Sequence, residues 1–147
     1  MKIQGNHKFN VERETLWDLL LDPDSLSATI PGCRELVETA PGVFEAKLNV
    51  GVAPVKGDFS GSVKLENVNP PSDFRMLVEG SGAPGFMKGS ALIKLESEGP
   101  TTVLDVDSDV QVGGVIAGVG QRMLGGVAKL LMGQFFKALE KQLAQKG

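Results

Sequence analysis

The sequence predicts an α+β fold in which a curved antiparallel sheet of about seven strands wraps around one long C-terminal helix. Residues 43 to 112 form a series of segments in which apolar and polar side chains alternate, as half-buried antiparallel strands require. From Val115 to about Leu143 the apolar spacing changes to three or four residues, the period of a helix. A sheet that curves around a single helix favours an apolar hollow between the two.

The N-terminal third is expected to form one strand followed by two short helices. Alternation in residues 1–9 places Met1, Ile3, Gly5, His7 and Phe9 on one face. Asn10 is a suitable N-cap for the first helix, which is expected to end near Asp22. Pro23 can open the second helix, and the turn signal at Pro31-Gly32 ends it.

Six further strands follow from the same alternation. The face expected to point inward carries mostly apolar side chains together with Gly57, Gly61 and Gly80, and glycine inside a strand often marks a bend or a close backbone approach. A loop rich in Gly and Pro is expected at 81–89. The strands are expected near 34–39, 43–50, 55–68, 74–80, 91–95 and 103–112.

Glycines are unusually frequent in the predicted terminal helix, with seven between positions 113 and 133. Each costs up to about 1 kcal/mol relative to alanine in a helix interior. Two explanations remain open: close approach of the sheet or a ligand, which is the preferred one, or a helix that begins late and bends.

The end of this helix is basic, with Lys129, Lys137, Lys141 and Lys146 beside the apolar residues Phe135, Phe136, Leu139 and Leu143. Such an end can contact anionic lipid or an acidic partner. The alternative is that the lysines only complement the helix dipole and keep the surface hydrated.

Length and charge restrict the class of protein. With 147 residues and a formal net charge of −3, the chain is expected to form one domain over residues 1–147 and not to bind nucleic acid, which requires a basic face. The N-terminus lacks the apolar core of a signal peptide, and the longest apolar run, 112–120, is shorter than the ~20 residues of a membrane span. A cytoplasmic protein is expected.

Side chains suited to catalysis are scarce. There is one histidine, His7, one cysteine, Cys33, and no tyrosine, so neither a cysteine-based metal cluster nor an intramolecular disulfide can form. Arg75 alternates with Phe74 and Met76 and is therefore expected to face outward. We predict no catalytic residues, no metal site and no covalently bound cofactor.

The candidate functional site is the apolar hollow itself. Its predicted mouth is the 83–89 loop, and its predicted ligand-binding residues come from the inward strand faces, that loop and the terminal helix: Phe44, Leu48, Phe59, Met76, Phe86, Met87, Val119 and Met123. The alternative is that these side chains simply pack against one another as core.

Several motifs resemble a known family. These are Ile30-Pro31-Gly32-Cys33, the run VGVAPVKGDFSG at 50–61, and the run GPTTVLDVDSDVQVGGVIAGVGQRML at 99–124 together with Phe135-Phe136. The order of elements is that of the helix-grip fold of START-like lipid-transfer domains and aromatic polyketide cyclases. Over nearly its whole length the chain resembles the CoxG family of carbon monoxide dehydrogenase subunits.

This resemblance implies an accessory protein for a molybdenum-containing hydroxylase such as carbon monoxide dehydrogenase, working at the inner face of the membrane with a quinone- or lipid-like apolar ligand. Three hypotheses remain open. The first is a non-enzymatic carrier or recruitment factor with an apolar cavity. The second is a cyclase- or dehydratase-like enzyme that uses His7, Arg75 or a cavity carboxylate. The third is an adaptor whose interior is filled.

Overall fold

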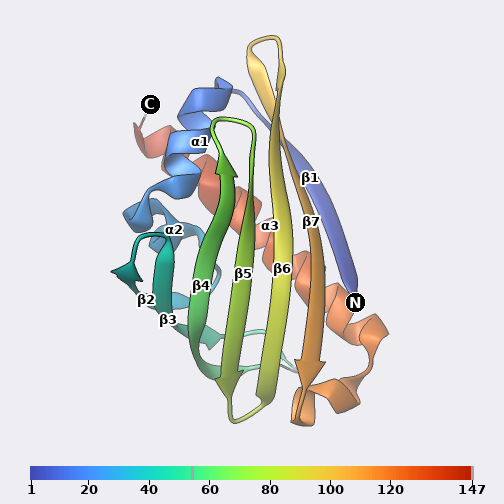
Figure 1. The fold of residues 1–147 in the computed structure, drawn as a ribbon. Coiled ribbons are helices and arrows are strands. Elements are labelled where there is room, and N and C mark those ends of the chain that lie inside the picture. Colours follow the sequence, from blue (N-terminus) through green and yellow to red (C-terminus); the bar gives the residue numbers. More distant parts are fainter. Residues whose placement is uncertain (54, 147) are drawn as a thin grey trace.

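The computed structural model describes residues 1–53 and 55–146, and within them it confirms the predicted α+β architecture (Figure 1). All neighbouring strands pair antiparallel, in the order β1-β7-β6-β5-β4-β3-β2. The strands are β1 (Lys2–Phe9), β2 (Cys33–Ala40), β3 (Val43–Val50), β4 (Gly57–Asn69), β5 (Asp73–Gly82), β6 (Gly85–Glu98) and β7 (Thr101–Gly113). The helices are α1 (Arg13–Leu21), α2 (Pro23–Thr29), the 3-10 turn η1 (Val115–Val119) and α3 (Gln121–Lys146).

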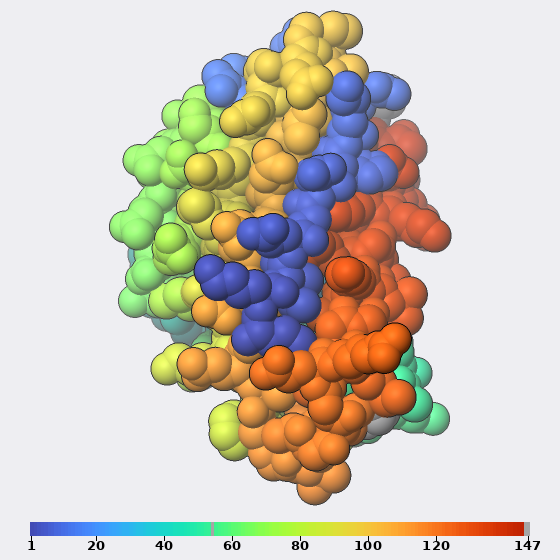
Figure 2. Space-filling view, turned by 90° about the vertical axis from the view of Figure 1, so that its right-hand side faces the viewer, coloured from blue at the N-terminus to red at the C-terminus, as the bar shows by residue number. Residues whose placement is uncertain are grey.

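Helix α3 crosses one face of the sheet, and α1 and α2 cover the C-terminal end of α3 (Figure 1). Its 26 residues give it a length of about 39 Å. At one edge of the sheet α3 lies directly alongside β1, as Figure 2 shows from the side. The helix is therefore supported by β1 along one side and by α1 and α2 near its end.

The buried side chains form separate clusters at the two ends of the space between α3 and the sheet. The larger cluster joins α1, the sheet and the C-terminal half of α3, with Trp17, Phe74 and Leu139 among its members. The smaller one joins Val55, Ile116 and Leu124 at the beginning of α3. Solid core at both ends leaves the middle of the helix facing a less filled region of the sheet.

The terminal helix begins later than its apolar period suggests. Residues 115–119 form a 3-10 turn, and Gly120 has a φ of 98°, which ends this turn before α3 starts at Gln121. A side chain at this φ would be strained, so glycine is the residue that suits the break. At Gly120, the late start of the helix is therefore the explanation that applies. At Gly114, a Cβ would lie 2.8 Å from Cα of Gly85, so the close-approach explanation holds there.

The close approaches between α3 and the sheet come from a glycine in the sheet. A Cβ atom on Gly5 in β1 would collide with Sδ of Met132, whereas a Cβ on Gly118, Gly125, Gly126 or Gly133 would meet nothing within 4 Å. The expectation that glycines of the helix permit close packing was therefore wrong for these four positions. In the sheet, a Cβ on Gly61 would collide with the backbone carbonyl of Glu79, consistent with the tight strand contact predicted there.

Two local expectations were also wrong. Helix α1 is preceded by Glu12 at its N-cap, not by Asn10, because Val11 stays in the incoming segment, where its carbonyl accepts a hydrogen bond from buried Thr102 at 2.8 Å. The expected loop at 81–89 is a tight turn: β5 and β6 pair as far as Gly82 and Gly85, which leaves only residues 83–84 between the strands.

We predict that the glycines of α3 lower stability without serving a contact. Replacing Gly126 or Gly133 with alanine should raise the free energy of unfolding by up to about 1 kcal/mol each, because the added methyl group enters open space and alanine favours the helix. Denaturant unfolding of the single variants provides the measurement. Gly61→Ala is the control and should instead destabilise by about 1–3 kcal/mol; a loss of stability in both helix variants would contradict the prediction.

Candidate functional site: an apolar cavity between the sheet and α3

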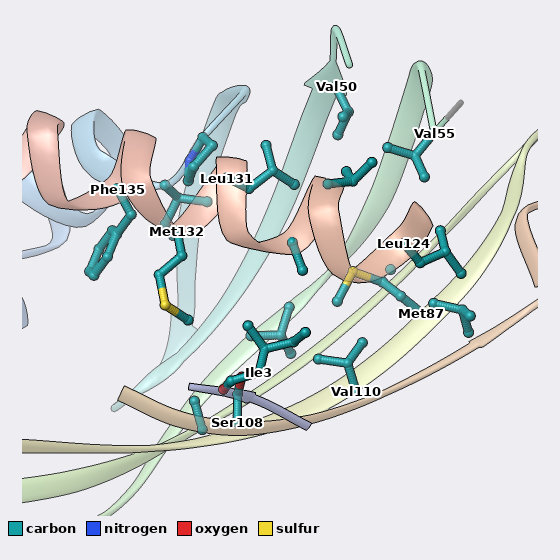
Figure 3. Close-up of a pocket in the computed structure, with 18 of the residues that line it drawn as sticks. Ile3, Val50, Val55, Met87, Ser108, Val110, Leu124, Leu131, Met132 and Phe135 are labelled. Atoms are coloured by element: carbon teal, nitrogen blue, oxygen red, sulfur yellow. The ribbon is translucent and has the colours of Figure 1, made fainter. Parts of the chain in front are cut away.

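A cavity of about 350 Å³ lies between the middle of α3 and the sheet, partly open to the surface (Figure 3). In the close-up, Met132 and Phe135 point down from the helix, Leu131 lies on the side of Val50, and Ile3, Ser108 and Val110 form the wall below the helix. The remaining wall is supplied by the other strands and the segments near β3: Met1, Ile30, Pro31, Leu48, Val50, Val55, Phe59, Met76, Val78, Glu79, Gly80, Met87, Ala91, Ile93, Val106, Val112, Ile116, Leu124, Val127 and Ala128.

The lining is almost entirely hydrocarbon and thioether. Two of its residues carry polar side chains, Glu79 and Ser108. The Glu79 carboxylate pairs with Lys88 at 3.6 Å, and both side chains are well exposed, so the cavity meets the backbone of Glu79 and not its charge. Ser108 therefore supplies the one side-chain polar group that the described wall turns toward the cavity.

Local sequence explains how the wall forms. In β7, Val106, Ser108, Val110 and Val112 face inward because strand residues alternate, and their aspartate neighbours face outward. In α3, the inward residues recur at the helical spacings of three and four, so they lie on one face of the helix: Leu124, Val127, Ala128, Leu131, Met132 and Phe135. The strand period of two and the helical period of about 3.6 thus place side chains on two sides of the same cavity.

Four of the residues predicted to contact a ligand line this cavity: Leu48, Phe59, Met76 and Met87. Leu48, Phe59 and Met76 come from β3, β4 and β5, whose inward faces the alternating pattern identified correctly, whereas Met87 was expected in a loop and lies in β6. Whether they contact a ligand stays a prediction.

Phe44 and Phe86 lie elsewhere. Phe44 is on the inward face but beside α2, where Leu26 and Val63 fill the space around it. Phe86 is 53% exposed and lies over Gly113 of β7, because β6 begins at Gly85 and strand alternation then turns Met87 inward and Phe86 outward. A short turn in place of the expected loop accounts for this difference.

Val119 and Met123 also lie outside the lining. Val119 belongs to η1 and packs against the cluster of Val55, Ile116 and Leu124, which closes one end of the cavity. Met123 is 58% exposed, because a helix that begins at Gln121 turns Leu124 toward the sheet and Met123 away from it. The late helix start is the physical reason for both placements.

The wall residues that the predicted set omitted come mainly from β1, β7 and α3. For the two strands, the signal was present in the sequence, because the alternation already placed Ile3, Val106 and Val110 on inward faces. For the helix, the register depended on where α3 begins, and the sequence left that start open.

Candidate catalytic groups lie outside the lining. His7 sits at the edge between β1 and α3, where Nε2 contacts Oε1 of Glu140 at 2.5 Å and the ring stacks on Phe136 with centroids 5.4 Å apart. Arg75 alternates with cavity-facing Met76 and points to the opposite side of the sheet. No cluster of three His, Cys, Asp or Glu side chains suited to a metal ion occurs in the described part of the chain.

Near the cavity, α3 and η1 expose apolar side chains. Val115 is 77% exposed and Leu130 is 50% exposed, and both neighbour residues of the lining or its end cluster. By contrast, Phe135, Phe136, Leu139 and Leu143 point inward, so the apolar residues beside the C-terminal lysines are already used by the core and cavity. Among residues 1–53 and 55–146, no helix has both the length and the apolarity to cross a membrane.

Solved structures share this architecture. A conserved protein from Geobacillus kaustophilus is 36% identical, with a TM-score of 0.95 over 99% of this chain and 96% of that one. A START superfamily protein from Mycobacterium smegmatis is 17% identical, with a TM-score of 0.79 over 99% of both chains. The AHSA1 protein from Silicibacter pomeroyi is 15% identical, with a TM-score of 0.69 over 100% of both. The last two similarities establish the helix-grip fold alone.

Comparison with functionally curated proteins finds no match. The sequence profile of CoxG, a subunit of carbon monoxide dehydrogenase, in contrast matches residues 5–144. This match covers the elements from α1 to η1 completely and most of β1 and α3. The chain therefore belongs to the CoxG family of carbon monoxide dehydrogenase subunits.

Proposed function

We propose that this protein is a non-enzymatic carrier that holds a quinone- or lipid-like apolar molecule between α3 and the sheet. The apolar cavity carries the proposal, because its volume suits a small organic molecule and its wall offers hydrocarbon on every side. An apolar cavity that remains empty forgoes van der Waals contacts on the order of several kcal/mol. An apolar ligand would recover much of that loss.

The family supplies the proposed setting. Its description names carbon monoxide dehydrogenase, and on that basis we assign to this chain an accessory role beside a molybdenum-containing hydroxylase of that kind. The carrier would exchange its apolar ligand with the enzyme. The enzymatic alternative on this fold is less well supported, because His7 and Arg75 lie away from the cavity wall.

Filling the cavity should abolish ligand binding. Ala91 lies in the wall of β6, paired with Met76 on one side and Ser108 on the other, so Ala91→Trp places an indole directly in the cavity. We expect an organic extract of the wild-type protein, analysed by mass spectrometry, to contain an apolar compound that the variant lacks. Displacement of an apolar fluorescent probe should follow the same pattern.

Glu96→Trp is the matched control, since Glu96 is exposed on the outward face of the same strand. It should retain the compound and the probe. Equal extracts from wild type and Ala91→Trp, with both proteins folded by circular dichroism, would exclude the cavity as the binding site.

The link to the enzyme needs a separate test. With purified carbon monoxide dehydrogenase and a quinone in vesicles, the wild-type protein should accelerate carbon monoxide-dependent quinone reduction, and Ala91→Trp should not. Acceleration by both proteins would support a recruitment factor that does not carry a ligand.

We also propose peripheral contact of η1 and the solvent-exposed side of the N-terminal half of α3 with anionic membrane lipid. Val115, Met123 and Leu130 expose apolar surface next to the cavity, and Arg122 and Lys129 lie among them. No acidic residue occurs between positions 110 and 139, although the whole chain has a net charge of −3. Exposed apolar side chains flanked by cations, in a stretch of sequence without acidic residues, fit the surface of an anionic bilayer.

Charge reversal can show which part of α3 makes this contact. Each cation near an anionic surface is worth about 1 kcal/mol, so Arg122→Glu with Lys129→Glu should strongly weaken co-sedimentation with phosphatidylglycerol vesicles at low salt. The matched control, Lys137→Glu with Lys141→Glu, reverses the same number of positive charges near the C-terminal end of α3 and should weaken vesicle binding less. A larger effect from the control would show that the C-terminal lysines make the contact instead. If the wild type does not bind vesicles, any membrane contact would have to come from the partner enzyme.

A further inference from the structure

Ser108 gives the otherwise apolar cavity a directional polar group. Its hydroxyl donates a hydrogen bond to the backbone carbonyl of Ile3 at 2.7 Å. A serine hydroxyl has one proton and two acceptor lone pairs. Since the proton is engaged, the oxygen can offer only its lone pairs to a molecule in the cavity, and no other hydrogen bond to this oxygen occurs among the described residues.

The position of Ser108 favours such a role. It lies in the centre of the wall, between Val106 and Val110 along β7 and opposite Ile3 of β1 and Ala91 of β6. Figure 3 shows Ser108 beside Ile3 on the wall that faces α3. Surrounding hydrocarbon excludes competing water, so a hydrogen bond formed here discriminates between ligands more strongly than one at the surface.

We propose that Ser108 selects apolar ligands that carry a hydrogen-bond donor, such as an alcohol, a phenol or a hydroquinone. This inference rests on the proposed carrier function and specifies the ligand class of the same cavity. A ligand whose polar group only accepts, such as an ether or a quinone carbonyl, would require Ser108 to give up its bond to Ile3. For a quinone-like ligand, the cavity therefore prefers the reduced, hydroxylated form.

A thermodynamic cycle isolates this contact. Para-nonylphenol and its methyl ether share a ring and a chain, but only the phenol has a donor. Binding of both is measured by calorimetry for the wild type and for Ser108→Ala. The preference for phenol over ether should be about two- to tenfold larger in the wild type, the usual range for one neutral hydrogen bond. Because the same two ligands meet both proteins, their different hydration cancels.

Two further variants guard against indirect effects. Ser108→Thr keeps the hydroxyl and suits a strand, so it should keep the wild-type preference even if Ser108→Ala loses stability along with its bond to Ile3. Ser60→Ala removes an exposed serine from β4, outside the cavity lining, and should leave the binding of both ligands unchanged.

The possible outcomes distinguish a failure of this inference from a failure of the carrier function on which it rests. Binding of both ligands with the same preference in wild type and Ser108→Ala would overturn the role of Ser108 and leave the carrier intact. A preference for the phenol that is larger in Ser108→Ala than in the wild type would overturn it as well. Failure of both ligands to bind the folded wild type, with no displacement of the apolar probe, would overturn the inference and the carrier function together.

Discussion

The anchoring of α3 at both of its ends is the constraint on which the cavity depends. Near the C-terminus, Phe136 and Leu139 are buried with Trp17 and Phe74. Near the N-terminus, Leu124 is buried with residues outside the helix. Burial of each large apolar side chain stabilises its cluster by about 1.5–3 kcal/mol. Moving either end of α3 closer to the sheet would disrupt this packing. The stiff helix between them therefore spans the gap, and the space below its middle persists. Met132 meets β1 at Gly5, where the absence of a side chain lets the helix approach closely on that side only.

Strand alternation depends only on local order, so the sequence was sufficient for the fold and for the inward faces of Leu48, Phe59 and Met76. Met87 also lines the cavity, but the sequence predicted it in a loop, so its place did not follow from the expected strands. Phe86 was misplaced because its face depends on whether residues 81–89 form a loop or continue two strands. The strands continue: Phe86 pairs with Ser81 of β5 and with Gly113 of β7, and the second of these contacts is distant in the sequence.

The helix side of the site was harder to predict for a different reason. A rotation of one residue turns a helical side chain by about 100°, so an error in where the helix starts moves residues between the core and solvent. For this reason Met123, which was predicted to line the cavity, faces solvent, and Leu124 lines the cavity instead. Gly118 and Gly120 signalled an interruption, but composition alone could not distinguish a break in the helix from a close contact. Phe44 shows a third limit, since its inward face was correct and only the position of α2 decided what covers it.

The pairing of β1 with β7 has a consequence for how the protein is made. Ile3 lies opposite Ser108, so β1 cannot pair with β7 until more than a hundred further residues have been synthesised. The helix that roofs the cavity follows later still. Contacts so distant in sequence form slowly, because a long loop must close before they are gained. The nascent chain therefore has no enclosed cavity until α3 has been synthesised, so the proposed loading with an apolar molecule would have to follow the synthesis of this helix.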